Sequence, residues 1–172
     1  MNHPEKDRKG TIEAWLAAMG VTSTPINDPQ ALWHIQVNYP PGSPHIMHVA
    51  CPKLTPEAVV ILSKMDIGRD LLDNFDGLDT DAKDEFLWKL RETLNTPRVD
   101  FKLEGVSAPQ ECPTAIVTSS VRYFEGVTLD SFARTVGCVF KTELSAQWVI
   151  FRYLAPKSYG NGDRFDFKRL GM

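Results

Sequence analysis

The chain has 172 residues, of which 42% are hydrophobic and 24% charged, with a formal net charge of −3. This composition is close to the average for soluble globular proteins, and the length suffices for one domain with its own core. The negative charge argues against a nucleic-acid partner, because affinity for phosphates comes largely from lysine and arginine. The longest apolar runs are far shorter than the roughly 20 residues of a membrane span, so we expect no membrane partner.

The N-terminus and the cysteines indicate the compartment. The first residues are polar and charged, and no continuous apolar segment follows them, so they do not resemble a secretion signal. The three cysteines, at positions 51, 112 and 138, lack the paired spacing of a zinc site. We therefore expect a cytoplasmic protein without a cysteine-based zinc site.

The first pattern along the chain is that of an amphipathic helix. Four apolar residues recur at the i, i+3, i+4, i+7 spacing that gathers side chains on one face: Ile12, Trp15, Leu16 and Met19. Gly20 stands where a left-handed C-cap is expected. Residues 25–29 are rich in turn formers and are predicted to be a loop in which the chain reverses.

Three strand patterns follow the loop. Residues 32–39 alternate between an apolar side with Trp33, Ile35, Val37 and Tyr39 and a polar side with His34, Gln36 and Asn38. A proline-rich turn at 40–44 leads into a second strand at 45–51, which predicts a hairpin. The run 58–62 then completes a three-strand antiparallel meander. Its continuous apolarity favours a strand covered on both faces, although Thr55-Pro56-Glu57 can also begin a helix, and this alternative remains open for 55–62.

The second half of the chain alternates between helix and strand. Residues 67–94 have helical spacing and divide at Gly77, with Asp79 and Thr80 as candidate N-caps. The strand at 98–104 is predicted to point Val99, Phe101 and Leu103 inward, and a longer strand follows from about 115 to 124. A final helix begins after Thr128 and carries an apolar stripe at three- or four-residue steps: Phe132, Val136, Phe140, Leu144, Trp148 and Phe151.

These patterns predict one α+β domain over residues 1–156 and a flexible C-terminal tail over 157–172. The order helix, three strands, helical region, two strands and helix resembles the type III secretion chaperone-like fold, and more closely a family of uncharacterised archaeal and bacterial proteins that share that fold. The resemblance rests on residues 58–72, 86–94, 99–103, 121–126 and 132–148. It implies a homodimer that holds an extended client polypeptide on its surface without cofactor or catalysis.

Two histidines are the best candidates for chemistry. A hairpin that turns at 40–44 brings His34 and His48 close together on the polar face, while His45 points the other way. Two imidazoles need a further metal ligand, and Gln36 is a poor one, so hydrogen-bonded histidines are favoured over a metal site. No nucleotide-binding glycine loop and no serine-nucleophile motif occurs in the chain.

Trp88 is the best candidate for an interface. The other tryptophans mostly fall on predicted apolar faces, whereas Trp88 lies about 200° from Phe86 on its helix. An exposed tryptophan on an acidic helix is typical of a contact surface. We therefore expect a non-enzymatic protein-binding module that uses Trp88, His34, Gln36 and His48. The alternative is a small metal-dependent or otherwise unrecognised enzyme that uses the polar face around His34 and His48.

Overall fold

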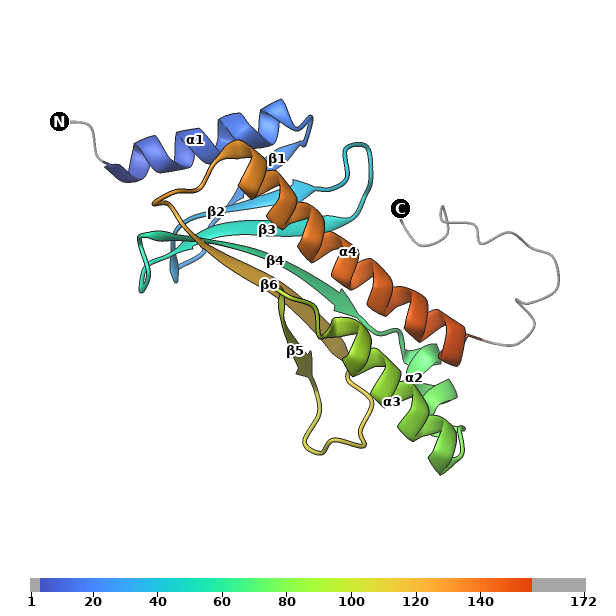
Figure 1. The fold of residues 1–172 in the computed structure, drawn as a ribbon. Coiled ribbons are helices and arrows are strands. Elements are labelled where there is room, and N and C mark those ends of the chain that lie inside the picture. Colours follow the sequence, from blue (N-terminus) through green and yellow to red (C-terminus); the bar gives the residue numbers. More distant parts are fainter. Residues whose placement is uncertain (1–3, 156–172) are drawn as a thin grey trace.

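The computed structural model describes residues 4–155, and the predicted tail at 157–172 lies outside these described residues. Within them the chain forms an α+β structure with four helices and a six-stranded antiparallel sheet (Figure 1). The elements in chain order are α1 (Pro4–Ala18), β1 (Ser23–Ile26), β2 (Ala31–Asn38), β3 (Ile46–Pro52), β4 (Ala58–Asp66), α2 (Arg69–Asp76), α3 (Thr80–Leu94), β5 (Asp100–Glu104), β6 (Ala115–Tyr123) and α4 (Leu129–Leu154). None of these helices is both long and apolar enough to cross a membrane.

The sheet has the strand order β1-β2-β3-β4-β6-β5. The predicted meander corresponds to β2, β3 and β4, and β6 joins it on the far side of β4 after the chain has passed through α2, α3 and β5. β6 pairs with β4 along its whole length, from Ala115 to Tyr123. β5 is shorter and covers only the first part of β6, from Ala115 to Ser119. The order of elements is therefore as predicted, apart from one additional strand.

The additional strand is β1, which lies where the sequence predicts the start of a loop. Residues Ser23–Ile26 pair antiparallel with β2, and Pro25 lies opposite Ile35. Proline cannot donate to a ladder and is tolerated at a sheet edge, which is the position of β1. The strand was missed because its proline and its exposed side chains are typical of a turn. Gly20 does end α1 in the left-handed conformation, with φ of +71°.

The segment at 55–62 is a strand from Ala58 onwards and not a helix. Val59 and Ile61 are buried on the face beneath the helices, while Val60 and Leu62 are half-buried on the opposite face. The prediction that this strand is covered on both faces is therefore wrong within the described residues. An antiparallel sheet needs only one covered face, which is the arrangement here.

Two predicted buried faces in the second half of the chain, those of β5 and α4, differ in the structure. Of the three residues predicted to point inward here, Val99, just before β5, is buried and Leu103 is half-buried, whereas Phe101 is exposed because β5 is an edge strand. In α4 the predicted stripe follows the buried face at Phe132 and Val136, but Trp148 is 52% exposed. Four successive four-residue steps turn a helix by about 160° beyond whole turns, so the stripe leaves the buried face.

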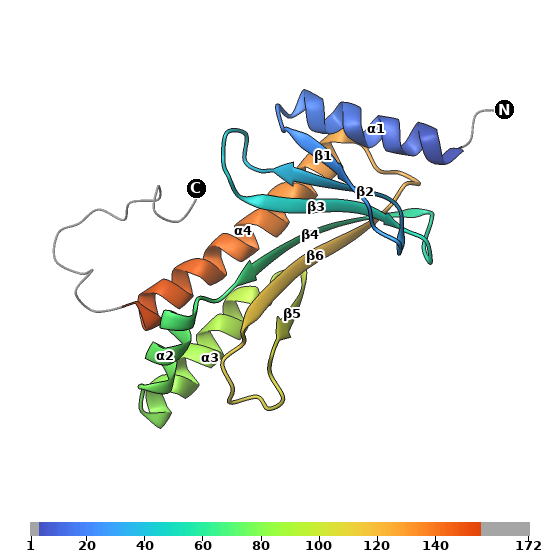
Figure 2. The same cartoon turned by 180° about the vertical axis from the view of Figure 1, so that it is seen from behind.

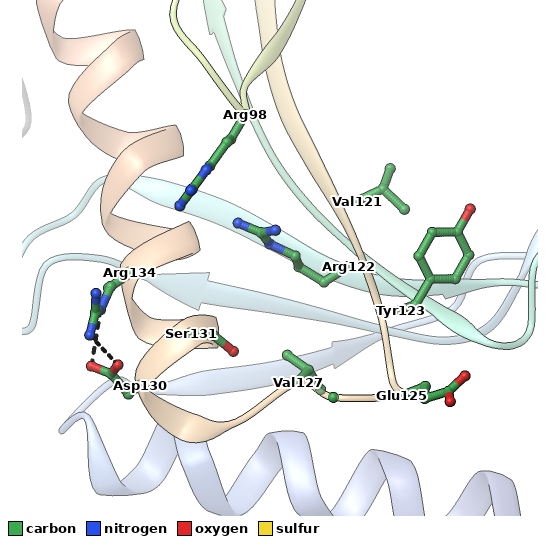
Figure 3. A pocket seen from close by; sticks show the side chains of 10 residues that line it. Arg98, Val121, Arg122, Tyr123, Glu125, Val127, Asp130, Ser131 and Arg134 are labelled. Atoms are coloured by element: carbon green, nitrogen blue, oxygen red, sulfur yellow. Dashed lines mark hydrogen bonds and ion pairs between the residues drawn. The ribbon is translucent and has the colours of Figure 1, made fainter.

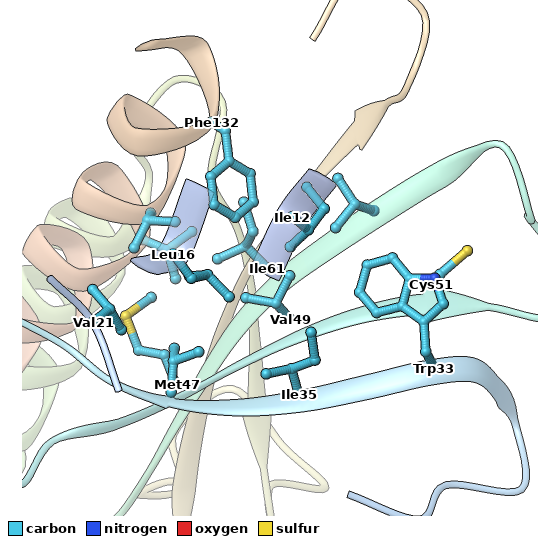
Figure 4. Close-up of a cluster of buried hydrophobic side chains, with 14 of the residues drawn as sticks. Ile12, Leu16, Val21, Trp33, Ile35, Met47, Val49, Cys51, Ile61 and Phe132 are labelled. Carbon is cyan, nitrogen blue, oxygen red and sulfur yellow. The ribbon is translucent and has the colours of Figure 1, made fainter. Parts of the chain in front are cut away.

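The core consists of two apolar clusters. The first lies between the sheet, α1 and the first half of α4 (Figure 4) and includes Ile12, Leu16, Ile35, Val49, Ile61 and Phe132. The second lies between α2, α3, the second half of α4 and the adjacent ends of β4 and β6, and it includes Leu71, Phe86, Leu90, Ile116 and Ile150. α4 crosses both clusters and joins them.

A buried polar layer separates the two clusters. Along β4 it contains Ser63, and along α4 it contains Thr142 and Glu143. On β6 the residue opposite Ser63 is Thr118, which is also fully buried. The layer lies where α4 crosses β4 and β6, so these polar side chains face one another between sheet and helix.

Candidate functional site

One face of the sheet carries no helix in the described part of the chain. The two apolar clusters place the helices against the opposite face, and Figure 2 shows the uncovered face from behind. We call this surface the open face. Strand alternation and register assign to it the side chains of His34, Gln36, Asn38, Ile46, His48, Ala50, Val60, Leu62, Lys64, Val117, Ser119, Val121 and Tyr123.

The open face has a polar part and an apolar part. The polar part lies on β2 and β3, with the two histidines and Gln36. The apolar part lies on β4 and β6, where Val121 is 45% and Tyr123 58% exposed. Clustered exposed apolar side chains on a sheet are typical of a contact surface.

The polar part contains a chain of three hydrogen-bonded side chains. His34 Nδ1 lies 2.9 Å from Asp28 Oδ2, and His34 Nε2 lies 3.0 Å from His48 Nδ1. The Asp28 carboxylate can only accept, so it places the proton of a neutral His34 on Nδ1. His34 Nε2 then accepts a hydrogen bond from His48 Nδ1–H, which leaves His48 Nε2 as an acceptor without a partner among the described residues. The predicted proximity of His34 and His48 is confirmed, and Asp28 is a partner that the sequence did not indicate.

Burial lowers the pKa of His48, and the nearby charge of His34 lowers it further. The pKa of Asp28 is also lowered, chiefly because its carboxylate accepts a hydrogen bond from the Gln30 backbone N–H. The array therefore combines an Asp28 carboxylate that favours its charged form with a His48 imidazole that favours its neutral form. Within the described residues, no group of three His, Cys, Asp or Glu side chains is arranged to hold a metal ion.

The four residues predicted to bind protein do not form one site. His34, Gln36 and His48 are neighbours on the open face, where Gln36 lies opposite His48. Trp88 lies on α3, on the helical side of the molecule, and is 72% exposed. Its predicted exposure is confirmed, while its contact role stays a prediction.

β6 has an edge that is free along its second half. Phe124 N–H donates to Glu57 C=O on the β4 side at 2.8 Å, so by alternation the backbone groups of Val121 and Tyr123 face away from β4. Among the described residues no strand pairs with β6 on that side beyond Ser119. The chain turns away from this edge at Arg98, whose φ is +72°.

A groove of about 550 Å³ lies between this free edge and the first turns of α4 (Figure 3). Arg98 and Arg122 extend toward each other in it, and within residues 7–155 neither forms an ion pair with a carboxylate. Arg122 Nε donates to Thr135 Oγ1 at 2.9 Å, which holds the side chain in place. Arg134 is bound to Asp130. Two unneutralised guanidinium groups make this groove suited to a carboxylate.

The buried polar layer contains a cluster that the sequence did not reveal. His45 Nε2 lies 3.2 Å from Ser63 Oγ, and His45 Nδ1 lies 3.7 Å from Glu143 Oε1. Ser63 Oγ also donates to Ile46 C=O at 3.2 Å. His45 immediately precedes β3, Ser63 lies on β4 and Glu143 lies on α4, so these residues are too far apart in the chain for a local motif. His45 points away from the open face, as predicted.

Ser63 is fully buried, so the cluster cannot present its hydroxyl to a substrate in this conformation. Burial raises the pKa of Glu143 to about 7, and burial lowers the pKa of His45. Both groups therefore favour their uncharged forms. Glu143 Oε2 and Thr118 Oγ1 have no hydrogen-bond partner among the described residues. The arrangement is a buried polar contact between helix and sheet.

The sequence and the fold were each compared with those of known proteins. Residues 8–150 match the model of a family described as an uncharacterized conserved protein, DUF2299. The chain belongs to this family.

The fold is similar to the crystal structure of an uncharacterized protein from Methanothermobacter thermautotrophicus, with a TM-score of 0.77 and 24% sequence identity over 86% of this chain and 99% of that chain. No curated protein matches the chain.

Proposed function

We propose that the protein is a non-enzymatic, chaperone-like protein-binding module that acts as a homodimer and holds a client polypeptide against its open face. The observation that carries the proposal is the open face itself, whose apolar part is left exposed by the described helices. The proposal agrees with what the resemblance to the type III secretion chaperone-like fold implies.

The chemistry of the open face suits an extended polypeptide. Val60 and Leu62 lie beside the exposed Val121 and Tyr123, and together they offer apolar contact area. His34, Gln36 and His48 supply donors and acceptors on the adjoining strands. A surface with an apolar part and a polar part can accept side chains of many sequences, as a binder of unfolded segments must.

A binding measurement tests this proposal. Reduced, carboxymethylated α-lactalbumin, a permanently unfolded polypeptide, would be labelled and its fluorescence anisotropy followed on titration with the full chain. The double substitution Val60→Thr and Leu62→Thr keeps the β-propensity of β4 and removes apolar contacts, so it should weaken binding roughly tenfold. Leu54→Thr is the matched control, because Leu54 is exposed but lies outside the open face. Equal binding by all three proteins would exclude the open face.

The Asp28–His34–His48 array supports a second candidate function, an enzyme that uses His48 as a general base. A carboxylate that orients an imidazole, which in turn positions a base, is an arrangement used in proton transfer. Titration of the purified protein with Zn²⁺, followed by calorimetry, tests a metal-dependent version. Stoichiometric binding that is lost in His34→Ala and in His48→Ala would favour the enzyme over the binding module.

A further inference from the structure

The side chains along the free edge of β6 determine which order of apolar and charged residues would suit a strand that pairs with it. Val121 and Tyr123 point to the open face, and Arg122 between them points into the groove beneath α4. A strand added to a sheet edge continues the alternation of its neighbour. The matching segment is therefore apolar, acidic, apolar, with the acidic residue beside Arg122 and Arg98.

The chain contains such a segment outside its described residues. Positions 165–167 are Phe165, Asp166 and Phe167, flanked by the cations Arg164 and Lys168. We propose that this segment of a second copy pairs with the free edge of β6, and that two copies exchange their segments reciprocally. The proposal rests on the homodimer of the proposed function and names the contact that forms it.

The acidic residue of the segment complements the two arginines of the groove. Asp166 would lie beside Arg98 and Arg122, which have no acidic partner within residues 7–155. Arg164 and Lys168 fall on the same side as Asp166, because side chains of a strand alternate with a period of two. The groove also contains Glu125, two residues after β6, which suits one of these cations. Phe165 and Phe167 would cover Val121 and Tyr123.

The length of the chain favours a second copy as the donor. The groove residues of α4, Asp130 to Arg134, lie 20–24 residues before its end at Leu154, which is about 30–36 Å at 1.5 Å per residue. The 11 residue steps from Ala155 to Asp166 reach about 36–40 Å when fully extended. The segment of the same copy would have to run back along α4 almost fully extended. A segment from a second copy has no such limit, and reciprocal exchange gives a closed two-fold dimer.

Charge reversal in the full chain tests the contact. Arg98→Asp and Asp166→Arg should each weaken dimerisation roughly tenfold in sedimentation equilibrium, and the double variant should restore it. Asp tolerates the positive φ of Arg98 better than most residues, so the first variant should still fold. Asp163→Arg, outside the alternating segment, is the matched control. Equal weakening by Asp163→Arg, or no restoration in the double variant, would overturn the proposal.

Photo-cross-linking identifies the donor of the segment. Phe167 would be replaced by benzoyl-phenylalanine in a mixture of ¹⁴N-labelled and ¹⁵N-labelled full chains. Cross-links to Val121 or Tyr123 that join the two labels support exchange, whereas cross-links confined to one label overturn it. A dimer unaffected by Asp166→Arg overturns the exchange alone. If that dimer still binds the unfolded polypeptide, the proposed function stands.

Discussion

Glu143 provides the sharpest prediction about the interior, because its charge is buried between α4 and the sheet. The residue is 5% exposed, and burial raises its pKa from an ordinary 4.5 to about 7, while a hydrogen bond with Ser63 partly opposes the shift. The folded protein therefore binds the Glu143 proton more tightly than the unfolded chain does. Glu143 stabilises the fold fully below about pH 4.5, and this contribution is lost as the pH rises through about 7.

The shift corresponds to about 3 kcal/mol, since each pKa unit is about 1.4 kcal/mol. Glu143→Gln keeps the shape of the side chain and cannot ionise. The free energy of unfolding of this variant, relative to the natural chain, should therefore rise by roughly 2–3 kcal/mol between about pH 5 and about pH 8.5. His45 is the titratable group that faces Glu143, and it is present in both proteins, so its own titration largely cancels in the difference.

Urea denaturation followed by circular dichroism at several pH values measures this difference. Glu57→Gln is the control, because Glu57 is exposed in the turn before β4, and its difference curve should be flat. A flat curve for Glu143→Gln as well would refute the reasoning, since it would mean that Glu143 is ionised in the fold at little cost.

Three smaller predictions concern other parts of the molecule. Thr128 caps α4 through a hydrogen bond from Ser131 N–H, so Thr128→Ala should lower the free energy of unfolding by about 1 kcal/mol, whereas Thr128→Ser should not. Gly105 and Gly126 both have positive φ, but a Cβ at Gly105 would clash with the side chain of Thr114, while one at Gly126 would meet open space among the described residues. By urea denaturation, Gly105→Ala should therefore be the more destabilising by about 1 kcal/mol or more, and equal losses would contradict this. His34→Gln should raise the pKa of His48 in an NMR titration because it removes a neighbouring charge, and an unchanged pKa would show that burial alone sets it.

The sequence predicted most helices and strands correctly, because side-chain periodicity and cap residues are properties of each segment alone. The alternation of Trp33, Ile35 and Val37 identified β2 and its buried side, and the spacing around Gly77 and Asp79 separated α2 from α3. Asp79 does cap α3, by accepting from Ala82 N–H at 2.8 Å. These signals depend on the period of one element and its ends, and the sequence contains both.

The errors occurred where position in the sheet decides burial. Phe101 belongs to a regular alternation, yet it is exposed because β5 is the outermost strand. Pro25 lies in a strand because β1 is at the opposite edge. Whether a strand lies at an edge depends on pairing with distant segments, and a local pattern does not report that pairing.

The same distinction applies to the candidate sites: contacts within one hairpin could be predicted, and contacts between distant segments could not. The contact between His34 and His48 could be predicted, because a tight hairpin fixes which residues of its two strands are neighbours. Asp28 joins them from outside that hairpin, and the Ser63–His45 contact extends to α4 only through tertiary packing. The groove beside Arg98 depends on where β5 leaves β6, which no residue pattern in either strand indicates.

Native mass spectrometry of the full chain mixed with the unfolded α-lactalbumin probe tests the central claim most directly. The account predicts a complex that contains two chains, twice 19.3 kDa, together with bound probe, and a marked loss of bound probe in the Val60→Thr, Leu62→Thr variant. A single chain without bound probe, at concentrations well above those in a cell, would contradict it.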